Sequence, residues 1–233
     1  MKTIGMIGGL SWESTSLYSM YLNEFAQKAC SHCAPLVIQG MDFTEVTHWL
    51  ERGDDESLTT ALIETAQQVE EMGADCLLLC SNTVHIFANE VAEAISIPLL
   101  HIGDTSAEAI RMQSINKIGV LGTKHTLKKD FYVERLESHG LQALCPSSEE
   151  CTWMHNIIMN ELSQGILSPK TKAGFQNIIQ NLIVQGAEGI LLACTEIPLL
   201  ITQEDVSVQL FDTAYLHAKQ AISFALQKET SPL

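Results

Sequence analysis

The sequence predicts an α/β protein made of two pseudo-symmetric, doubly wound parallel-sheet domains, with the active site in the cleft between them. Short apolar segments that are typical of buried parallel strands alternate with longer segments of helical periodicity. The same ordered set of segments occurs twice along the 233 residues. A chain of this length is long enough to give each half, of about 100 residues, its own core.

The first half begins with a strand and a glycine-rich turn at residues 2–9, followed by a helix at 11–29 that Ser11 or Ser14 caps. Strands that alternate with helices are typical of a doubly wound sheet. The elements expected next are a strand at 34–43, an amphipathic helix at 55–73, an apolar strand at 74–80, a helix at 85–96 and a strand at 97–102.

The second half repeats the landmarks of the first. An alignment of the two halves pairs Ala74 with Ala187 and places Ser81 opposite Cys194. Further on, "PLLHIGDT" in the first half resembles "VQLFDT" in the second. The expected elements are a strand at 116–123, helices at 127–140 and 174–186, and a strand that opens the segment 187–200.

The duplication predicts where the domains divide. The first domain is expected to comprise residues 1–100 plus 213–233, and the second residues 101–212. No long linker or low-complexity segment separates them. Residues 228–233 are expected to form an irregular tail.

The composition argues against several classes of function. The formal net charge is −15, so the chain lacks the basic face of a nucleic-acid-binding protein. Seven irregularly spaced cysteines argue against a disulfide scaffold and for a reducing compartment. The first apolar run is too short and broken for a signal peptide, and no run reaches the roughly 18 residues of a membrane helix. We therefore expect a cytoplasmic protein that binds neither nucleic acid nor membrane.

Polar residues follow the two matched apolar strands. "CSNT" follows the strand of the first half, and "ACTE" follows its counterpart in the second. Ligands of open α/β sheets bind beyond the carboxyl ends of the strands. In a pseudo-twofold protein two such ends can face each other across a cleft, which suits a reaction that treats both faces of a substrate alike. Racemisation is such a reaction, because one wall removes the Cα proton and the opposite wall supplies a new one.

Five motifs are spread in order along nearly the whole chain: "MKTIGMIGGLSWEST" at 1–15, "CSNTVH" at 80–85, "LGTKHT" at 121–126, "ACTEIPLL" at 193–200 and "FDTAYLHA" at 211–218. Together they resemble the cofactor-independent aspartate/glutamate racemase superfamily, and most of all its aspartate racemase branch. A single Cys-Thr-Glu is unspecific, but five ordered motifs are specific. The resemblance implies catalysis without a cofactor, a dicarboxylic amino-acid substrate, a final helix that crosses back to the first half, and a homodimer.

The family usually carries a catalytic cysteine in each half, as Cys-Asn-Thr and as Cys-Thr-Glu. Cys194 matches the second motif, whereas Ser81 occupies the first cysteine position and Cys80 lies one residue earlier. The internal alignment gives the same result, because it pairs Ser81 with Cys194. A step of one residue along a strand reverses the direction of the side chain. Cys80 is therefore expected to point away from the cleft, into the core.

Cys194 and Ser81 are the expected catalytic pair. Nearby amides or a helix N-terminus can lower a thiol pKa from its ordinary value of about 8.5 and produce a reactive thiolate. Cys194 is therefore expected to be the strong base. A serine hydroxyl is a much weaker acid that needs a base beside it, so Ser81 is expected to deliver or relay a proton.

The remaining site residues are expected to hold the substrate. Asn82, Thr83 and Thr195 offer donors to the α-carboxylate, as strand-to-helix turns often do, and Glu196 can accept from the α-ammonium group. By resemblance, the other contacts are Ser11 after the glycine-rich turn, Arg52 as counterion of the distal carboxylate, and Thr123 with Thr126 in the binding loop of the second half.

No metal or nucleotide cofactor is expected. Cys76, Cys80 and His85 match no usual zinc spacing, and the alternation of strand side chains scatters them. His85 is expected to be a structural hydrogen-bonding residue. The turn "GMIGG" lacks the G-x-G-x-x-G spacing of a dinucleotide site.

The expected function is cofactor-independent racemisation of aspartate or glutamate. Two alternatives stay open. One is another carbanion reaction of the same superfamily, such as hydantoin racemisation or a decarboxylation, which can use a single cysteine. The other is a catalytically impaired amino-acid-binding protein that has lost its first cysteine. The choice between aspartate, glutamate and a broader range of substrates also stays open.

Overall fold

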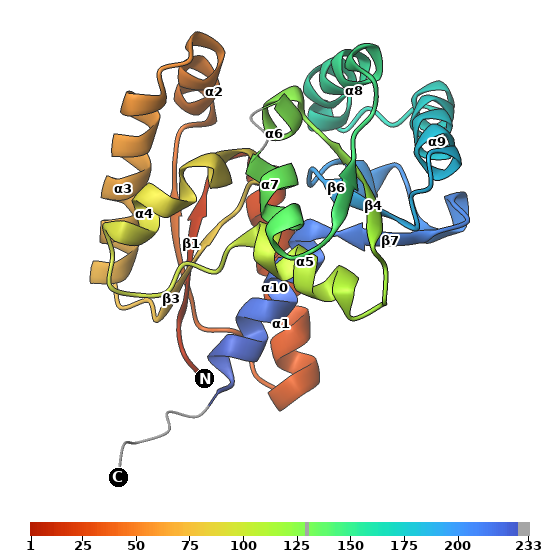
Figure 1. The fold of residues 1–233 in the computed structure, drawn as a ribbon. Coiled ribbons are helices and arrows are strands. Elements are labelled where there is room, and N and C mark those ends of the chain that lie inside the picture. Colours follow the sequence, from red (N-terminus) through yellow and green to blue (C-terminus); the bar gives the residue numbers. More distant parts are fainter. Residues whose placement is uncertain (129–130, 228–233) are drawn as a thin grey trace. The chain divides into compact units, whose positions relative to one another are not determined.

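The computed structural model describes residues 1–128 and 131–227, which form two compact units (Figure 1). Unit 1 comprises Met1–His101 and the residues from His217 onward, and unit 2 comprises Ile102–Leu216. The sequence placed the two divisions after residues 100 and 212. That each unit folds as a separate domain stays a prediction, and the expected tail at 228–233 lies outside the described residues.

Unit 1 is built on a parallel sheet with strand order β2-β1-β3. Helices α1 and α3 pack on its central strand, β1. The elements in chain order are β1 (Ile4–Gly8), α1 (Trp12–Cys30), β2 (Leu36–Gly40), α2 (Phe43–Arg52), α3 (Asp55–Glu71), β3 (Cys76–Leu79), the 3₁₀ helix η1 (Thr83–Phe87), α4 (Ala88–Glu93) and most of α10 (Thr213–Ala225).

Unit 2 is built on a parallel sheet with strand order β5-β4-β6-β7. Helices α8 and α9 pack against β4. The elements are α5 (Ile102–Arg111), β4 (Lys117–Gly122), α6 (Lys124–Lys128), α7 (Phe131–Ser138), β5 (Gln142–Leu144), α8 (Ser148–Asn160), η2 (Leu162–Gln164), α9 (Pro169–Val184), β6 (Gly189–Ala193), η3 (Ile197–Leu199), η4 (Gln203–Asp205) and β7 (Gln209–Asp212).

The two parallel sheets confirm the predicted fold class, and their details support the internal duplication. The order β2-β1-β3 corresponds to β5-β4-β6. Asp75, before β3, accepts a hydrogen bond from the backbone N–H of Thr3 at 2.6 Å. Its aligned counterpart Glu188, before β6, accepts one from the backbone N–H of Lys117 at 3.1 Å. A carboxylate at the aligned position thus connects the starts of the two corresponding strands in each unit.

The last helix crosses back to the first half, as the family resemblance implied. From His217 onward α10 belongs to unit 1. Its end is tied to the start of the chain, because the backbone N–H of Lys2 donates to the carbonyl of Ala225 at 2.9 Å.

The strand expected at 97–102 is reduced to one parallel bridge between Leu77 and Leu99. The carbonyl of Pro98 accepts from Leu77 at 2.9 Å, and Leu100 donates to Leu77 at 3.0 Å. Proline has no N–H to extend a ladder, and α5 begins at Ile102, so the segment stays a single bridge. It occupies the position in unit 1 that β7 takes in unit 2.

Several other elements differ from the prediction. The helix expected at 85–96 is split into η1 and α4, and the helix expected at 174–186 begins at Pro169 behind the cap residue Ser168. The helix expected at 127–140 includes residues 129 and 130, which lie outside the described residues; α7 follows them. The sequence did not predict α2, α5, β5 and α8, nor that α10 begins at Thr213.

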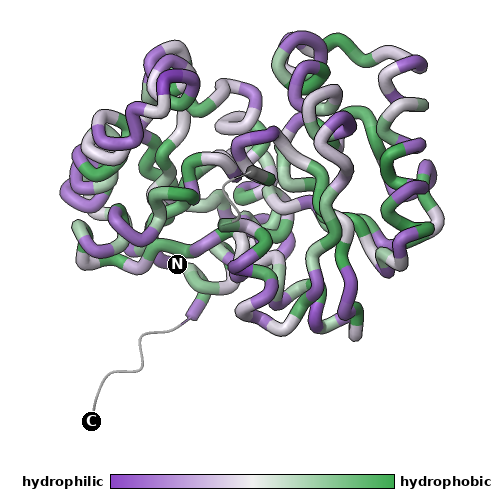
Figure 2. The backbone as a smooth tube through the Cα atoms, turned by 45° about the horizontal axis from the view of Figure 1, so that its top comes forward, coloured by the Kyte–Doolittle hydropathy of each residue, from purple (hydrophilic) through white to green (hydrophobic). Residues whose placement is uncertain are grey.

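Each unit has its own apolar core around its sheet. All residues of β1, β3 and β6 are buried, as expected for strands with long apolar runs. Along the helices, hydrophilic residues alternate with hydrophobic ones (Figure 2), which is the pattern of helices with one buried face. These three strands therefore lie at the centre of their units, whereas the edge strands β2, β5 and β7 are partly exposed.

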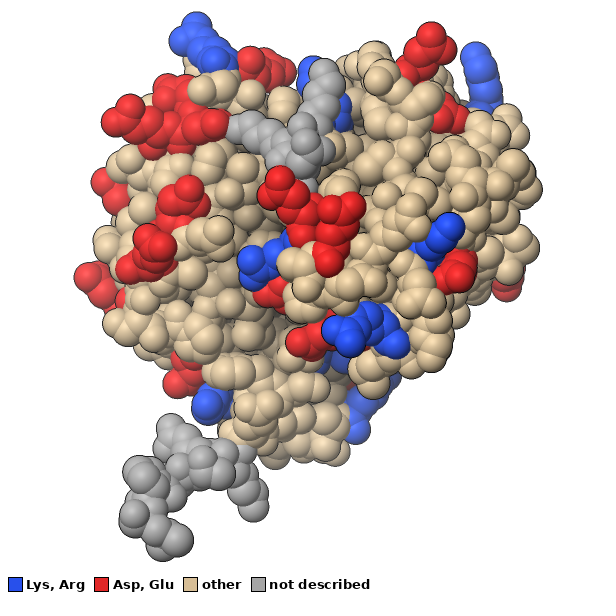
Figure 3. All heavy atoms as spheres, viewed as in Figure 1, with Lys and Arg blue, Asp and Glu red and all other residues tan. Residues whose placement is uncertain are grey.

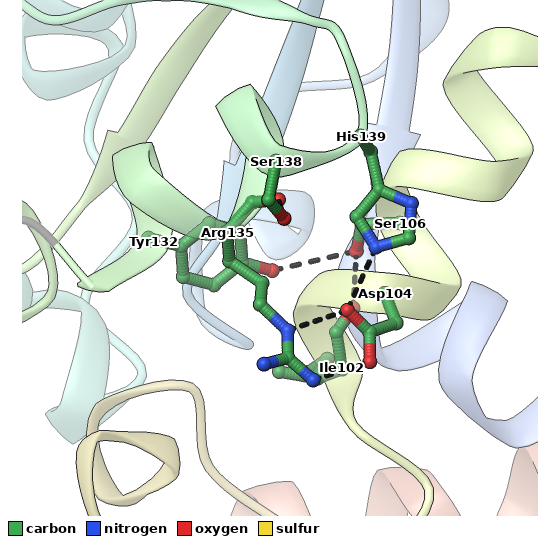
Figure 4. A network of polar contacts seen from close by, with 7 residues as sticks. All are labelled: Ile102, Asp104, Ser106, Tyr132, Arg135, Ser138 and His139. Carbon is green, nitrogen blue, oxygen red and sulfur yellow. Dashed lines mark hydrogen bonds and ion pairs between the residues drawn. The ribbon is translucent and has the colours of Figure 1, made fainter.

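A polar network fixes α5 against α7 in unit 2 (Figure 4). Arg135 donates to both carboxylate oxygens of Asp104 at 2.5 and 2.6 Å, and Nε2 of His139 lies 2.9 Å from the same carboxylate. The hydrogen bond to Asp104 raises the pKa of Arg135. On the same helices, the hydroxyls of Ser106 and Tyr132 lie 3.4 Å apart.

Acidic side chains are spread over the face of the molecule shown in Figure 3, with separate lysines and arginines between them. Within the described ranges 1–128 and 131–227, no helix combines the length and the apolar character that crossing a membrane requires.

Candidate active site

In unit 1, the ends of β1 and β3 bring the first glycine-rich turn beside the segment that contains Ser81. The strands are in register up to Ile7 and Leu79, and the N–H of Cys80 donates to the carbonyl of Ile7 at 3.0 Å. Gly9 follows β1 with φ of 71°, and a Cβ there would lie 2.1 Å from a backbone oxygen of the turn after β2. Only glycine combines this conformation with this space.

Cys80 lies in the core, as predicted from the one-residue step. Its side chain is fully buried, and burial raises the pKa of its thiol far above the ordinary value. The next residue, Ser81, is only partly buried. The hydroxyl of Ser14 donates to the carbonyl of Cys80, and Ser11 caps α1 by accepting from the N–H of Ser14 at 3.1 Å. The start of α1 is thus fastened to the segment that carries Ser81.

In unit 2, the ends of β4 and β6 bring Thr123 beside Cys194. Gly122 is in register with Ala193, and a Cβ on this glycine would lie 2.9 Å from the carbonyl oxygen of Ala193. The hydroxyl oxygens of Thr123 and Thr126 lie 3.1 Å apart, and the N–H of Thr126 donates to Thr123 at 3.3 Å. The expected binding loop is therefore compact and adjoins the end of β6.

Cys194 and Glu196 form a buried pair at the end of β6. The thiol of Cys194 donates to Oε2 of Glu196 at 2.8 Å. The two residues are only 7% and 8% exposed. Because a carboxylate accepts and does not donate, the proton in this contact belongs to the sulfur. The sequence predicted Glu196 as a partner of the substrate ammonium group; the structure gives it a contact with the thiol.

The thiol of Cys194 is not a ready thiolate, contrary to the expectation of a lowered pKa. Burial and the negative charge of Glu196 raise its pKa well above the ordinary value, and the hydrogen bond to Glu196 acts in the same direction. The backbone N–H groups of Thr195 and Glu196 lower it, but their effect is smaller. The sequence showed the nearby amides but not that the carboxylate two residues later turns back onto the sulfur.

Three predicted carboxylate-binding residues follow the same strand ends. Asn82 and Thr83 lie at the start of η1 in unit 1, and Thr195 directly follows Cys194 in unit 2. Asn82 and Thr195 are buried.

Arg52 is the predicted site residue that stands at the end of a helix and not in a segment that follows a strand. It is exposed in the last turn of α2. Within the described part of the chain, its side chain makes no hydrogen bond or ion pair with the strand-end residues. Its role toward a distal carboxylate remains a proposal.

Two residues in unit 1 that hold the Ser81 segment were missed as contributors to the site. The sequence predicts Ser14 only as a helix cap and His85 only as a structural hydrogen-bonding residue. Nδ1 of His85 lies 2.7 Å from the carbonyl oxygen of Ser81, a contact between residues i and i+4. The spacing of Ser81 and His85 in "CSNTVH" was a signal for this bond, because such residues are neighbours on a helical turn.

Comparison with known proteins gives matches over almost the whole chain. The family model of Asp/Glu/hydantoin racemases matches residues 7–221. A candidate Asp/Glu racemase from Yersinia pestis has a crystal structure with a TM-score of 0.92 and 37% identity, covering 97% of this chain and 100% of that one. An aspartate racemase homologue from Pyrococcus horikoshii OT3 gives 0.86 and 35% over the same shares. The broad specificity amino-acid racemase RacX of Bacillus subtilis (strain 168) is 25% identical over 94% of this chain and 96% of its own.

Proposed function

The chain belongs to the Asp/Glu/hydantoin racemase family, and from that membership we propose that it racemises aspartate or glutamate without a cofactor. Cys194 is the proposed acid/base on one face of the substrate Cα, and Ser81 is the proposed proton donor or relay on the other. The homologues named for aspartate and for Asp/Glu racemisation support a dicarboxylic substrate. The relation to RacX supports a wider choice of amino acids.

The observation that carries the proposal is the buried pair of Cys194 and Glu196. Abstraction of an α-proton needs a strong base, and a thiol is a base only after it has lost its proton. Glu196 lies 2.8 Å from the sulfur and is positioned to accept that proton. A high thiol pKa makes the resulting thiolate a stronger base toward a carbon acid. The pair therefore supplies both the activation of the thiol and the basicity of the thiolate.

The proposed proton path closes in one cycle. The Cys194 proton passes to Glu196, and the thiolate then removes the Cα proton and becomes a thiol again. Ser81 donates its hydroxyl proton to the opposite face of the carbanion and recovers a proton from water. Glu196 returns its proton to the hydroxide left by that water, so the enzyme ends in its starting state. The reverse reaction follows the same steps backwards.

The Ser81/Cys194 asymmetry cannot favour one direction of reaction. Enantiomers in water have equal free energy, so the overall equilibrium constant is one and the kcat/KM values of the two directions are equal. What the asymmetry can change is the exchange of the α-proton without inversion. We expect that, in D₂O, the enantiomer whose Cα–H faces Cys194 exchanges this proton faster than it racemises. Equal rates of exchange and inversion for both enantiomers would contradict the asymmetric mechanism.

The remaining details of the substrate site are also proposed from the resemblance. Asn82, Thr83 and Thr195 are proposed to bind the α-carboxylate, with Ser11, Thr123 and Thr126 lining the site. Arg52 is proposed to pair with the distal carboxylate, so Arg52→Ala should raise KM for aspartate and glutamate more than for alanine. An equal effect on all three substrates would contradict this assignment.

The proposed assembly is a cytoplasmic homodimer. The odd number and irregular spacing of the seven cysteines support a reducing compartment. Sedimentation equilibrium tests the dimer, and a monomer at micromolar concentration would contradict it.

Chiral chromatography of L- and D-aspartate and L- and D-glutamate incubated with the purified protein tests the function. The proposal predicts interconversion in both directions, and loss of it in Cys194→Ala. Binding without interconversion or α-proton exchange would favour an amino-acid-binding protein. Activity on hydantoins or malonates, with none on amino acids, would favour the other carbanion reactions.

A further inference from the structure

The two peptide groups that flank Ser81 are each held by a side chain. The hydroxyl of Ser14 donates to the carbonyl of Cys80, and Nδ1 of His85 lies 2.7 Å from the carbonyl of Ser81. A carbonyl oxygen only accepts, so Nδ1 of His85 carries the hydrogen in this contact. The orientation of the peptide groups before and after a residue fixes its φ and ψ. The direction of the Cα–Cβ bond of Ser81 is therefore set by Ser14 on one side and by His85 on the other.

His85 is itself enclosed by aromatic side chains of unit 1. It is 2% exposed, and its ring meets those of His101 and His217 edge-on at centroid distances of 4.9 and 5.6 Å. These rings restrict rotation of the His85 ring away from the carbonyl of Ser81.

His217 is fixed in turn. Its Nε2 donates to the carbonyl of Leu100 at 2.6 Å, so Nδ1 of the neutral ring accepts from the hydroxyl of Tyr18 at 2.9 Å. Burial is the main reason that the pKa of His217 is lowered to about 4, which keeps the ring neutral near pH 7. Residues from α1, the segment before α5 and α10 thus support one imidazole behind Ser81.

We propose that His85 is a positioning residue for Ser81, which aims the serine hydroxyl at the substrate through the hydrogen bond between Nδ1–H and the Ser81 carbonyl. In this role His85 transfers no proton and touches no substrate. The expected effect of His85 on catalysis rests on the proposed function, because Ser81 delivers a proton only in that function. The structural part of the proposal, the restraint of the Ser81 segment, stands independently of any activity.

The proposal predicts an effect confined to one face of the substrate. A misaimed hydroxyl slows the protonation at the Ser81 face, so kcat/KM for racemisation falls equally in both directions. Misplacement of a reacting group by about 1 Å can cost up to about 100-fold, and we expect a loss between about 10- and 100-fold for His85→Leu. Exchange of the α-proton that faces Cys194 does not use Ser81 and is expected to persist.

Three substitutions of His85 separate the hydrogen bond from general packing. The amide nitrogen of asparagine stands as far along the side chain as Nδ1, so His85→Asn can keep the donor. The amide nitrogen of glutamine stands where Nε2 stood, so His85→Gln removes the donor from that position, as His85→Leu does. Val84→Ala is the matched control, because Val84 is 1% exposed in the same short helix and its truncation loosens packing without removing the hydrogen bond.

The experiment measures inversion by chiral chromatography and α-proton exchange in D₂O by NMR for each variant. The expected result is a high ratio of exchange to inversion in His85→Leu and His85→Gln, and a ratio near that of the unmodified protein in His85→Asn and Val84→Ala. An equal loss of exchange and inversion in all His85 variants would mean that His85 only supports the fold. Unchanged inversion in His85→Leu would also overturn the proposal.

A second measurement needs no activity. Backbone hydrogen–deuterium exchange, followed by mass spectrometry of peptides that cover residues 80–86, should be faster in His85→Leu than in His85→Asn. Equal exchange in these two variants would refute the restraint of the Ser81 segment. If the unmodified protein neither racemises amino acids nor exchanges their α-protons, the proposed function fails, whereas this comparison still decides the role of His85.

Discussion

Replacing Glu196 with glutamine should lower the pKa of Cys194. The carboxylate oxygen lies 2.8 Å from the sulfur, and both residues are buried. Coulomb's law gives about 6 kcal/mol between two unit charges at this distance for an effective dielectric constant of about 20. Removing this repulsion stabilises the thiolate, so the pKa of Cys194 should fall in Glu196→Gln. The N–H groups of residues 195 and 196, which favour the thiolate, stay in place.

The rate at which iodoacetamide alkylates Cys194, measured as a function of pH by mass spectrometry of its peptide, reports this pKa. The profile of Glu196→Gln should move to lower pH, while racemisation falls by about 10-fold or more because the thiolate becomes a weaker base and its proton acceptor is lost. Glu188→Gln is a matched control, since this carboxylate precedes the same strand but bonds only to backbone N–H groups. A Cys194 profile that stays in place, or moves to higher pH, in Glu196→Gln would show that Glu196 does not raise the pKa of Cys194.

Three further predictions concern stability. The pKa of His217 is about 4 in the folded protein and near 6.5 in the unfolded chain, so the stability that the neutral ring contributes is present above pH 6.5 and is lost as the pH falls toward 4. Urea denaturation should show that the free energy of unfolding falls by up to roughly 3 kcal/mol over this range. This loss should be absent in His217→Gln. Asp104→Asn removes the charge that Arg135 contacts and should lower the free energy of unfolding by about 1–2 kcal/mol at low salt and by less at 1 M salt. An equal loss at both salt concentrations would contradict an ionic contribution. Gly9→Ala should cost more than Gly53→Ala in the same assay, because both have positive φ but only Gly9 also has backbone atoms where the new Cβ would lie; equal costs would disprove the close approach.

The sheets were predictable because their apolar runs and their repetition are properties of the sequence itself. The pairing of Asp75 with Glu188 in the alignment corresponds to one hydrogen-bonding role in both units. The strand expected at 97–102 followed from the apolar character of the segment alone, although Pro98, which cannot donate, was a signal in the sequence against a full strand. Helix α2 was missed although Phe43, Val46 and Leu50 recur at helical spacing, so the signal was present in the sequence. The start of α8 did carry a local signal, because Ser147 and Glu150 form a capping box.

The sequence predicted which residues stand at the strand ends of the candidate site, but it predicted fewer of the contacts between them. Counting along a strand was sufficient to place Cys80 in the core and to set Ser81 apart from it. The contact between Cys194 and Glu196 depends on how the chain turns after β6, which residue spacing does not determine. The two hydrogen bonds that hold the peptide groups around Ser81 come from Ser14 and His85, which are 71 residues apart. Their combination is therefore apparent only in the folded unit.

The role of Cys194 as the base can be measured as deuterium incorporation at Cα of L- and D-aspartate and L- and D-glutamate in D₂O, with the unmodified protein compared with Cys194→Ala. The proposed mechanism predicts that the unmodified protein incorporates deuterium, faster than it inverts one enantiomer. Cys194→Ala should lose that incorporation while circular dichroism shows that its fold is retained. Incorporation by Cys194→Ala at the rate of the unmodified protein would show that Cys194 is not the base.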